Sequence, residues 1–224
     1  MSDARWKTVD HYLEHVLLRP DDGLDAALRE SASAGLPTIQ VSPLQGKLLQ
    51  LLVASLGARR VLEIGTLGGY SGICMARALP ADGRIVTLEA DPRHAAIARA
   101  NFERAKVSAK IDVRVGPALR TLPELAREGG KPFDLVFIDA DKPNTAAYFD
   151  WAMRLARPSA VVVVDNVVRQ GTVSDPSSTD PNVQGMRRFL ERIAAEPGVE
   201  GTVVQTVGAK GYDGFAIVRL GGRS

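Results

Sequence analysis

Short apolar runs alternate with amphipathic stretches along most of the chain. The runs are rich in Val, Ile and Leu, as is typical of strands that are buried on both faces of a sheet. The predicted strands cover residues 61–64, 84–88, 111–115, 133–138, 160–164, 202–207 and 214–220. Between them, the predicted helices cover residues 92–106, 119–127 and 183–195. This alternation predicts an α/β fold, with a Rossmann-like, doubly wound and mostly parallel sheet of seven strands.

The part of the chain before the first strand shows helical periodicity. Ser42 is a suitable N-cap, and Pro43 suits the first helical turn after it. The helices predicted here cover residues 6–18, 24–34 and 44–56. Each has an apolar stripe that needs burial and has no strand of its own, so we expect these N-terminal helices to cover the sheet.

Length and composition are those of one globular domain. We expect a single domain over residues 1–224, with a helical cover at 1–57 and a catalytic core at 58–224. Hydrophobic residues make up 45% of the chain, and its net charge of +2 gives no strong attraction to nucleic acid or to membranes. The single cysteine, Cys74, excludes an internal disulfide and is expected to be a buried apolar residue. No signal peptide or membrane span is recognised, which predicts a cytoplasmic protein.

A glycine-rich turn, with Gly65, Gly68 and Gly69, follows the first predicted strand. Glycines let the backbone approach a ligand closely at the carboxyl end of a strand, where α/β sheets bind ligands. The spacing differs from G-x-G-x-x-G and the acidic Glu63 precedes the turn, so pyrophosphate binding is disfavoured. The pattern therefore favours S-adenosylmethionine, which carries no phosphate, over NAD. The alternative is a strand-to-helix turn without a ligand.

The second predicted strand ends in an acidic residue, Glu89. At this distance beyond the glycine turn, nucleotide folds place a residue that holds ribose hydroxyls through charge-assisted hydrogen bonds. The alternative is that Glu89 only leaves the sheet at the surface. Another tight turn, Gly116-Pro117-Ala118, follows the third strand, and such turns line adenine sites.

Two later strands also end in polar residues, the fourth at Asp139 and the fifth at Asp165-Asn166. These strand ends bring two carboxylates and one amide to the edge of the sheet that carries the glycine turn, without His or Cys. Hard divalent cations prefer such oxygen ligands, and Mg²⁺ is typically held by one or two carboxylates. The pattern favours a magnesium site; the alternative is that these aspartates cap helices.

These motifs resemble those of a known enzyme family. They are Glu63-x-Gly65 with Gly69-Tyr70-Ser71, Glu89, Gly116-Pro117-Ala118, Phe137-Ile138-Asp139-Ala140-Asp141-Lys142 and Asp165-Asn166. Over about residues 38–220 the chain is similar to the cation-dependent class I O-methyltransferases, which include the catechol and caffeoyl-CoA O-methyltransferases. The resemblance implies methyl transfer from S-adenosylmethionine to a hydroxyl, an antiparallel last strand and a homodimer.

The same resemblance implies roles for individual residues. The metal ligands would be Asp139, Asp165 and Asn166. Lys142 corresponds to the general base of the catechol enzymes, and with Asp139 it forms the expected catalytic pair. The alternative for Lys142 is an exposed lysine that pairs with Asp141. Contacts with S-adenosylmethionine are implied for Val41, Glu63, Gly65, Gly69, Ser71, Glu89, Ala118 and Asp139.

The substrate is less constrained by the sequence. Arg169 stands in the stretch where plant caffeoyl-CoA enzymes usually carry Trp, and Asp141 stands where the mammalian catechol enzyme has Trp, so neither namesake substrate is assigned. The polar run 170–181 is predicted to be a substrate-facing loop without a helix or strand. We expect Mg²⁺-dependent methylation of a small catechol-like phenolic substrate. A tRNA hydroxyuridine O-methyltransferase, an NAD-dependent oxidoreductase and a noncatalytic nucleotide-binding module stay open as alternatives.

Overall fold

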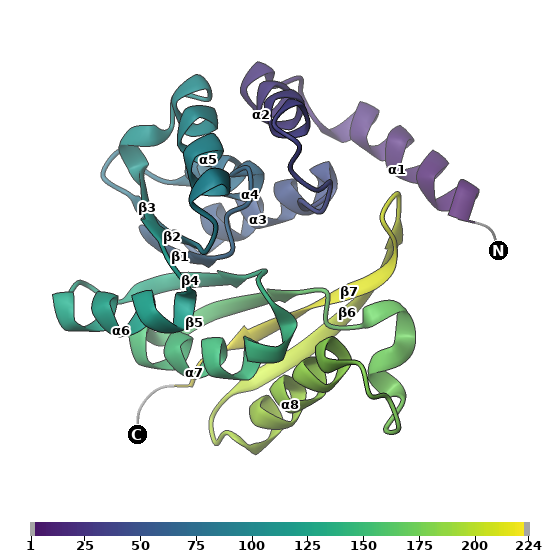
Figure 1. The fold of residues 1–224 in the computed structure, drawn as a ribbon, viewed down its shortest axis with the longest axis vertical. Coiled ribbons are helices and arrows are strands. Elements are labelled where there is room, and N and C mark those ends of the chain that lie inside the picture. The colour runs from purple at the N-terminus through teal and green to yellow at the C-terminus, as the bar shows by residue number, and fades with distance from the viewer. Residues whose placement is uncertain (1–2, 222–224) are drawn as a thin grey trace.

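Seven strands form one sheet in the computed structural model, which describes residues 3–221 (Figure 1). Their order across the sheet is β3-β2-β1-β4-β5-β7-β6. The strands are β1 (Arg60–Ile64), β2 (Arg84–Glu89), β3 (Ile111–Val115), β4 (Phe133–Ile138), β5 (Ala156–Asp165), β6 (Glu200–Gly208) and β7 (Gly211–Arg219). β7 is antiparallel to both neighbours, and the other six strands share one direction. The predicted fold class, with its antiparallel last strand, is confirmed.

Helices cover both faces of the sheet, as Figure 1 shows. One layer contains α2 (Asp22–Ser33), α3 (Pro43–Ser55), α4 (Tyr70–Ala78) and α5 (Pro92–Arg104), and α1 (Asp3–Leu17) extends from it. The other layer contains α6 (Ala118–Glu128), α7 (Thr145–Leu155) and α8 (Pro181–Ala195). Short 3₁₀ helices lie in three connections, namely η1 (Ser108–Lys110), η2 (Lys142–Asn144) and η3 (Arg169–Ser174). Within residues 3–221, none of the helices combines the length and the apolar character that crossing a membrane requires.

Two apolar cores lie on opposite sides of the sheet, because successive side chains of a strand point to opposite faces. In β1, Val61 packs into the core under α2–α5, whereas Leu62 and Ile64 pack into the core under α6–α8. All three side chains are fully buried. Since both faces of the strand are covered, its sequence is a nearly continuous apolar run. The buried acid within that run, Glu63, is the exception that leads to the site.

Three helices begin at the N-caps that the local sequence indicates. The bonds are Gln45 N to Ser42 Oγ (3.2 Å), Arg93 N to Asp91 Oδ1 (2.7 Å) and Asn182 N to Asp180 Oδ1 (2.8 Å). In each helix a proline follows the cap, at a position where its missing N–H has no helical partner to lose. One such cap stabilises a helix by about 1 kcal/mol, so these starts are decided locally.

The connections differ from the sequence prediction in three places. No helix is predicted between β4 and β5, whereas α7 lies there with its Tyr148 and Phe149 buried between neighbouring helices and the sheet. The prediction that 170–181 carries no element is wrong at its start, because η3 ends at Ser174. The expected loop between the last two strands is only a two-residue turn, because β6 and β7 pair out to Gly208 and Gly211.

The tip of the β6–β7 hairpin lies beside α1 (Figure 1), although the two are far apart in sequence. The carboxylate of Asp10 accepts a hydrogen bond from the backbone N–H of Ala209 at 2.6 Å. A Cβ atom at Gly208 would come within 2.4 Å of the same carboxylate, so the contact requires glycine there. The ammonium of Lys210 donates to the carbonyl of Gln40. The hairpin thus ties the N-terminal helices to the carboxyl edge of the sheet.

Candidate active site

A cavity of about 640 Å³ opens at the carboxyl edge of the parallel strands. Open α/β sheets bind ligands at this edge because the turns that follow their strands converge there. Most residues singled out from the sequence line it, namely Val41, Gly65, Ser71, Glu89, Ala118, Asp139, Lys142 and Asn166. Three others, Glu63, Gly69 and Asp165, lie behind this lining. The structure therefore brings the predicted cofactor and metal residues together at one cavity. Some of them line the cavity, and the others lie behind the lining residues.

The glycine turn after β1 needs glycine for two different steric reasons. Gly65 has a φ of +99°, and a Cβ atom there would come within 2.0 Å of the carbonyl oxygen of Asp139. Gly69 has a φ of +84°, and its Cβ would come within 2.5 Å of the ring of Phe102. Gly65 thus allows the turn to pack closely against the end of β4, whereas Gly69 allows it to pack against Phe102 of α5. The cofactor contact that the sequence implies for Gly69 stays a prediction.

Glu63 lies beneath the turn and is fully buried. Its carboxyl group accepts hydrogen bonds from Ser71 Oγ at 2.5 Å and Thr87 Oγ1 at 2.6 Å. Burial raises the pKa of Glu63 to about 7, and the two hydroxyl donors offset only part of that effect. Glu63 therefore supports the lining residue Ser71 from behind, and the cofactor contact that the sequence implies for Glu63 itself stays a prediction.

Glu63→Gln is expected to make stability less dependent on pH. Because the pKa of Glu63 is about 7 in the folded protein and 4.5 as a reference, the folded state binds the extra proton between these values. The free energy of unfolding of the natural protein therefore falls as pH rises through this window. Glutamine does not titrate, so the variant should gain about 3 kcal/mol relative to the natural protein between about pH 4.5 and 7.

Urea unfolding of both proteins at several pH values across that window measures the difference. Glu103→Gln, which changes an exposed carboxylate on α5, is the matched control and should follow the natural protein. If the Glu63 variant also follows the natural protein, the assigned pKa is contradicted.

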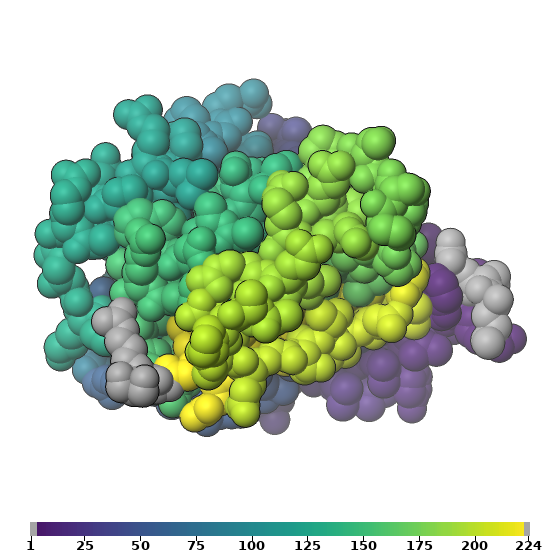
Figure 2. Space-filling model, turned by 90° about the horizontal axis from the view of Figure 1, so that it is seen from below, coloured from purple at the N-terminus to yellow at the C-terminus, as the bar shows by residue number. Residues whose placement is uncertain are grey.

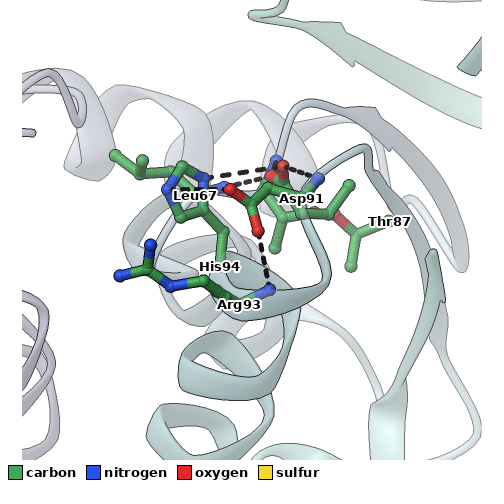
Figure 3. A network of polar contacts seen from close by, with 7 residues as sticks. Leu67, Thr87, Asp91, Arg93 and His94 are labelled. Carbon is green, nitrogen blue, oxygen red and sulfur yellow. Dashed lines mark hydrogen bonds and ion pairs between the residues drawn. The ribbon is translucent and has the colours of Figure 1, made fainter. Parts of the chain in front are cut away.

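Glu89, at the end of β2, is buried and holds the glycine turn through backbone N–H groups. Figure 3 shows the polar contacts at this point, with Leu67, Asp91 and His94 labelled. Its Oε2 accepts from Thr66 at 3.1 Å and Leu67 at 2.8 Å, and its Oε1 accepts from Asp91 at 2.9 Å. A carboxylate offers about four acceptor positions, so three are already used and one, on Oε1, is open to a ligand. His94 Nδ1 lies 3.7 Å from the same Oε1 and lines the cavity. The alternative that Glu89 only leaves the sheet at the surface is therefore wrong.

The two aspartates predicted as metal ligands lie at the carboxyl ends of neighbouring strands, since Asp139 follows Ile138 of β4, Asp165 ends β5, and Ile138 is in register with Val164. Asp165 is 6% exposed. Its pKa is raised to about 6, first by burial and then by the nearby negative charge of Asp139. Asn166 comes next with a left-handed φ of +58°, and it lines the cavity.

These donors fit a hard cation. Asp139 and Asn166 line the cavity, and Asp165 lies behind this lining, close enough for its charge to repel that of Asp139. Two carboxylates and an amide oxygen are a set of donors that suits Mg²⁺. No group of three or more His, Cys, Asp or Glu side chains that could hold a metal occurs within residues 3–221, so the amide of Asn166 is needed to complete the set.

Lys142 is 8% exposed, and its Nζ donates a hydrogen bond to Asp139 Oδ1 at 2.8 Å. The alternative of an exposed lysine paired with Asp141 is wrong, because Asp141 instead accepts from Tyr148 Oη and from Asn144 Nδ2. The backbone around Lys142 packs closely on α8, where a Cβ atom at Gly185 would come within 2.2 Å of the Lys142 carbonyl. Two elements distant in sequence therefore position this lysine beside the predicted metal ligands.

Several lining residues are not identified from the sequence. His94 stands three residues after a recognised cap, and Tyr148 lies on α7, which the sequence prediction lacks. Asn182 reaches the cavity from the start of α8. The signal for His94 was its position on the first turn of the helix after Glu89, where side chains face the carboxyl edge. Tyr148 and Asn182 could not be identified from the sequence, because the packing of α7 and α8 brings them to the cavity.

Residues 20–219 match the O-methyltransferase family. The chain is 51% identical over 217 residues to a catechol O-methyltransferase of Niastella koreensis, covering 97% of this chain and 98% of that one. It is 54% identical over 209 residues to a catechol O-methyltransferase of Mycobacterium tuberculosis, covering 93% of each.

Among solved structures, an O-methyltransferase from Bacillus cereus in complex with SAH has a TM-score of 0.97 and 54% identity, covering 98% of this chain and 100% of that one. The family match spans most of the chain, and these relatives align over nearly their whole length. The chain therefore belongs to the cation-dependent class I O-methyltransferases, the family of the catechol and caffeoyl-CoA enzymes, and it is an S-adenosylmethionine-dependent O-methyltransferase.

Proposed function

We propose that this enzyme uses Mg²⁺ and transfers the methyl group of S-adenosylmethionine to one hydroxyl of a small catechol-like substrate. The observation that carries the proposal is the group of Asp139, Asp165 and Asn166 at the carboxyl ends of β4 and β5, with Lys142 bonded to Asp139. The relatives that are named catechol O-methyltransferases support the substrate class.

The proposed chemistry divides between the two ends of the cavity. Asp139, Asp165 and Asn166 would hold the cation, which supplies Lewis acidity toward two adjacent oxygens when bound. Lys142, with its Nζ as the neutral amine, accepts the proton of the reacting hydroxyl and becomes an ammonium. The new bond joins that oxygen to the methyl carbon, and the broken bond leaves its electron pair on the sulfur. Glu89 and the glycine turn orient the cofactor so that oxygen, carbon and sulfur can lie in line.

Turnover of small catechols compared with undermodified tRNA tests the proposal. Both substrates are supplied with S-adenosylmethionine and Mg²⁺, and methyl transfer is measured with a labelled methyl group. We expect transfer to catechols such as caffeic acid and none to tRNA, since a net charge of +2 provides little attraction to a phosphate backbone. Transfer to tRNA alone would replace the proposal with the hydroxyuridine alternative.

Glu89→Ala is expected to weaken S-adenosylmethionine binding by about 10- to 150-fold, because a hydrogen bond to a charged group contributes about 1.5–3 kcal/mol. Calorimetric titration of the cofactor and of its demethylated product measures the change. Asp112→Ala removes an exposed carboxylate from the neighbouring β3 and is the matched control, with little expected change. Binding of NAD comparable to that of S-adenosylmethionine would contradict the cofactor assignment.

We propose that two copies of the chain form a homodimer through α1 and β6. Val9, Tyr12, Val16 and Leu17 of α1 are 49–65% exposed, and Val203, Val204 and Val207 of β6 are 37–51% exposed. β6 is an edge strand, and Figure 2 shows the last strands running along the surface to the purple N-terminal helix. A long apolar edge of this kind needs a cover.

Sedimentation equilibrium should therefore give twice the chain mass of 24.0 kDa. Val16→Glu should shift the protein toward monomer, whereas Val115→Glu, at the opposite edge of the sheet, should not. A natural protein that stays monomeric at all concentrations would refute the dimer.

The chain is also proposed to be one domain over 1–224, with residues 1–57 covering a catalytic core at 58–224. The support is that β1 contributes to both apolar cores, so neither core can be separated from the sheet. The cytoplasmic location expected from the sequence stays a prediction.

A further inference from the structure

Arg169 is a cation on the cavity wall that the proposed chemistry does not use. It lies four residues after the end of β5 and lines the same cavity as Asp139, Lys142 and Asn166. The sequence places this arginine in the stretch where plant caffeoyl-CoA enzymes usually carry an aromatic residue.

The backbone that presents Arg169 is held in an unusual conformation. Arg169 has a φ of +54° and Gln170 a φ of +57°, both in the left-handed region. Such residues each cost about 1–2 kcal/mol, and they persist only where the surrounding structure imposes them. Here Asp213 of β7 imposes the turn, because its Oδ1 accepts from the backbone N–H groups of Val168 and Arg169, both at 3.0 Å. The fold thus maintains a strained turn that places Arg169 at the cavity.

The guanidinium of Arg169 lacks a protein partner among residues 3–221. Its Nε is buried without a hydrogen bond, and no carboxylate of that range lies within ion-pair distance. The acids that share the cavity wall have other partners, since Asp141 bonds Tyr148 and Asp139 bonds Lys142. A partly buried charge without a partner is unfavourable. A guanidinium on the cavity wall without a protein partner is available to an anionic group that enters the cavity.

We infer that Arg169 binds a carboxylate carried by the methyl acceptor, so that the preferred substrates are acidic catechols. The planar guanidinium fork matches a carboxylate through two parallel N–H···O bonds, which a neutral ester or alcohol cannot reproduce. The inference rests on the proposed function, because the vicinal diol of the same molecule would lie at the Asp139, Asp165 and Asn166 end. The two ends of the acceptor are thus recognised by different chemistry.

Caffeic acid and its methyl ester test this, because they share the diol and differ in the charge of the other end. The measured quantity is the ratio of kcat/KM for the acid to kcat/KM for the ester, with Mg²⁺ and S-adenosylmethionine present. We expect a ratio of at least about 10 for the natural enzyme and a loss of most of that preference in Arg169→Gln. Arg188→Gln makes the same charge change at an exposed position of α8, and its ratio should match the natural one.

A natural enzyme that methylates both compounds with equal efficiency would overturn the inference and leave the proposed function standing. A preference that survives in Arg169→Gln would also overturn it. If neither compound is methylated, the proposed function fails, and calorimetric binding of the acid against the ester then decides the role of Arg169 separately. Should the glutamine variant not fold, Arg169→Lys carries the same test with a smaller expected loss, because lysine keeps the charge without the fork.

Discussion

Asp165→Ala is expected to abolish methyl transfer to caffeic acid, and added Mg²⁺ is expected not to restore it. In the natural enzyme, chelator should stop the reaction and Mg²⁺ should restart it. The reason lies in the raised pKa of Asp165, about 6, which burial and the charge of Asp139 produce. Two close carboxylates that resist ionisation together are a strong attractor for a divalent cation, and removing one leaves a single carboxylate and an amide.

Binding of Mn²⁺, followed by electron paramagnetic resonance, gives a readout that does not depend on turnover. The variant should lose most of the binding, and thermal unfolding in chelator checks that it folds. Asp175→Ala removes an exposed aspartate from the segment after η3 and should behave like the natural enzyme. Full activity of the natural enzyme in excess chelator would remove the metal from the proposal.

Lys142→Met is expected to lower kcat by roughly 10²–10⁴, the usual contribution of a general base. The lysine is buried and lies 2.8 Å from a predicted metal ligand, so its amine is held close to where a bound hydroxyl would lie. Methionine keeps much of the side-chain volume and removes the proton acceptor. Activity should recover in part at high pH, because the substrate hydroxyl then ionises without help.

Separate titrations distinguish this effect from lost binding. The affinities for S-adenosylmethionine and for the metal should change little, because Glu89, Asp139, Asp165 and Asn166 are all retained in the variant. Lys131→Met changes an exposed lysine in the connection before β4 and is the matched control. A loss of less than about threefold would mean that Lys142 is not the base, and metal activation alone would carry deprotonation.

Local features of the fold could be predicted from the sequence because their causes are local. The strands buried on both faces appear as apolar runs, and β3 and β4 begin and end where those runs do. The caps at Ser42, Asp91 and Asp180 each depend on a bond within three residues. The carboxyl ends of parallel strands must meet at one edge, so Asp139 and Asp165 could be placed together before any contact was known.

The α/β class, the edge of the sheet that carries the site and part of its lining could therefore be predicted from the sequence alone. Which of the predicted residues face the cavity and which support it depends on the tertiary packing. Glu63 turned out to lie under the glycine turn because Ser71 and Thr87 meet it from different elements. Arg169 is presented by Asp213, from a strand far along the chain. Such contacts depend on packing between distant segments, so they cannot be predicted from the spacing of residues along one segment.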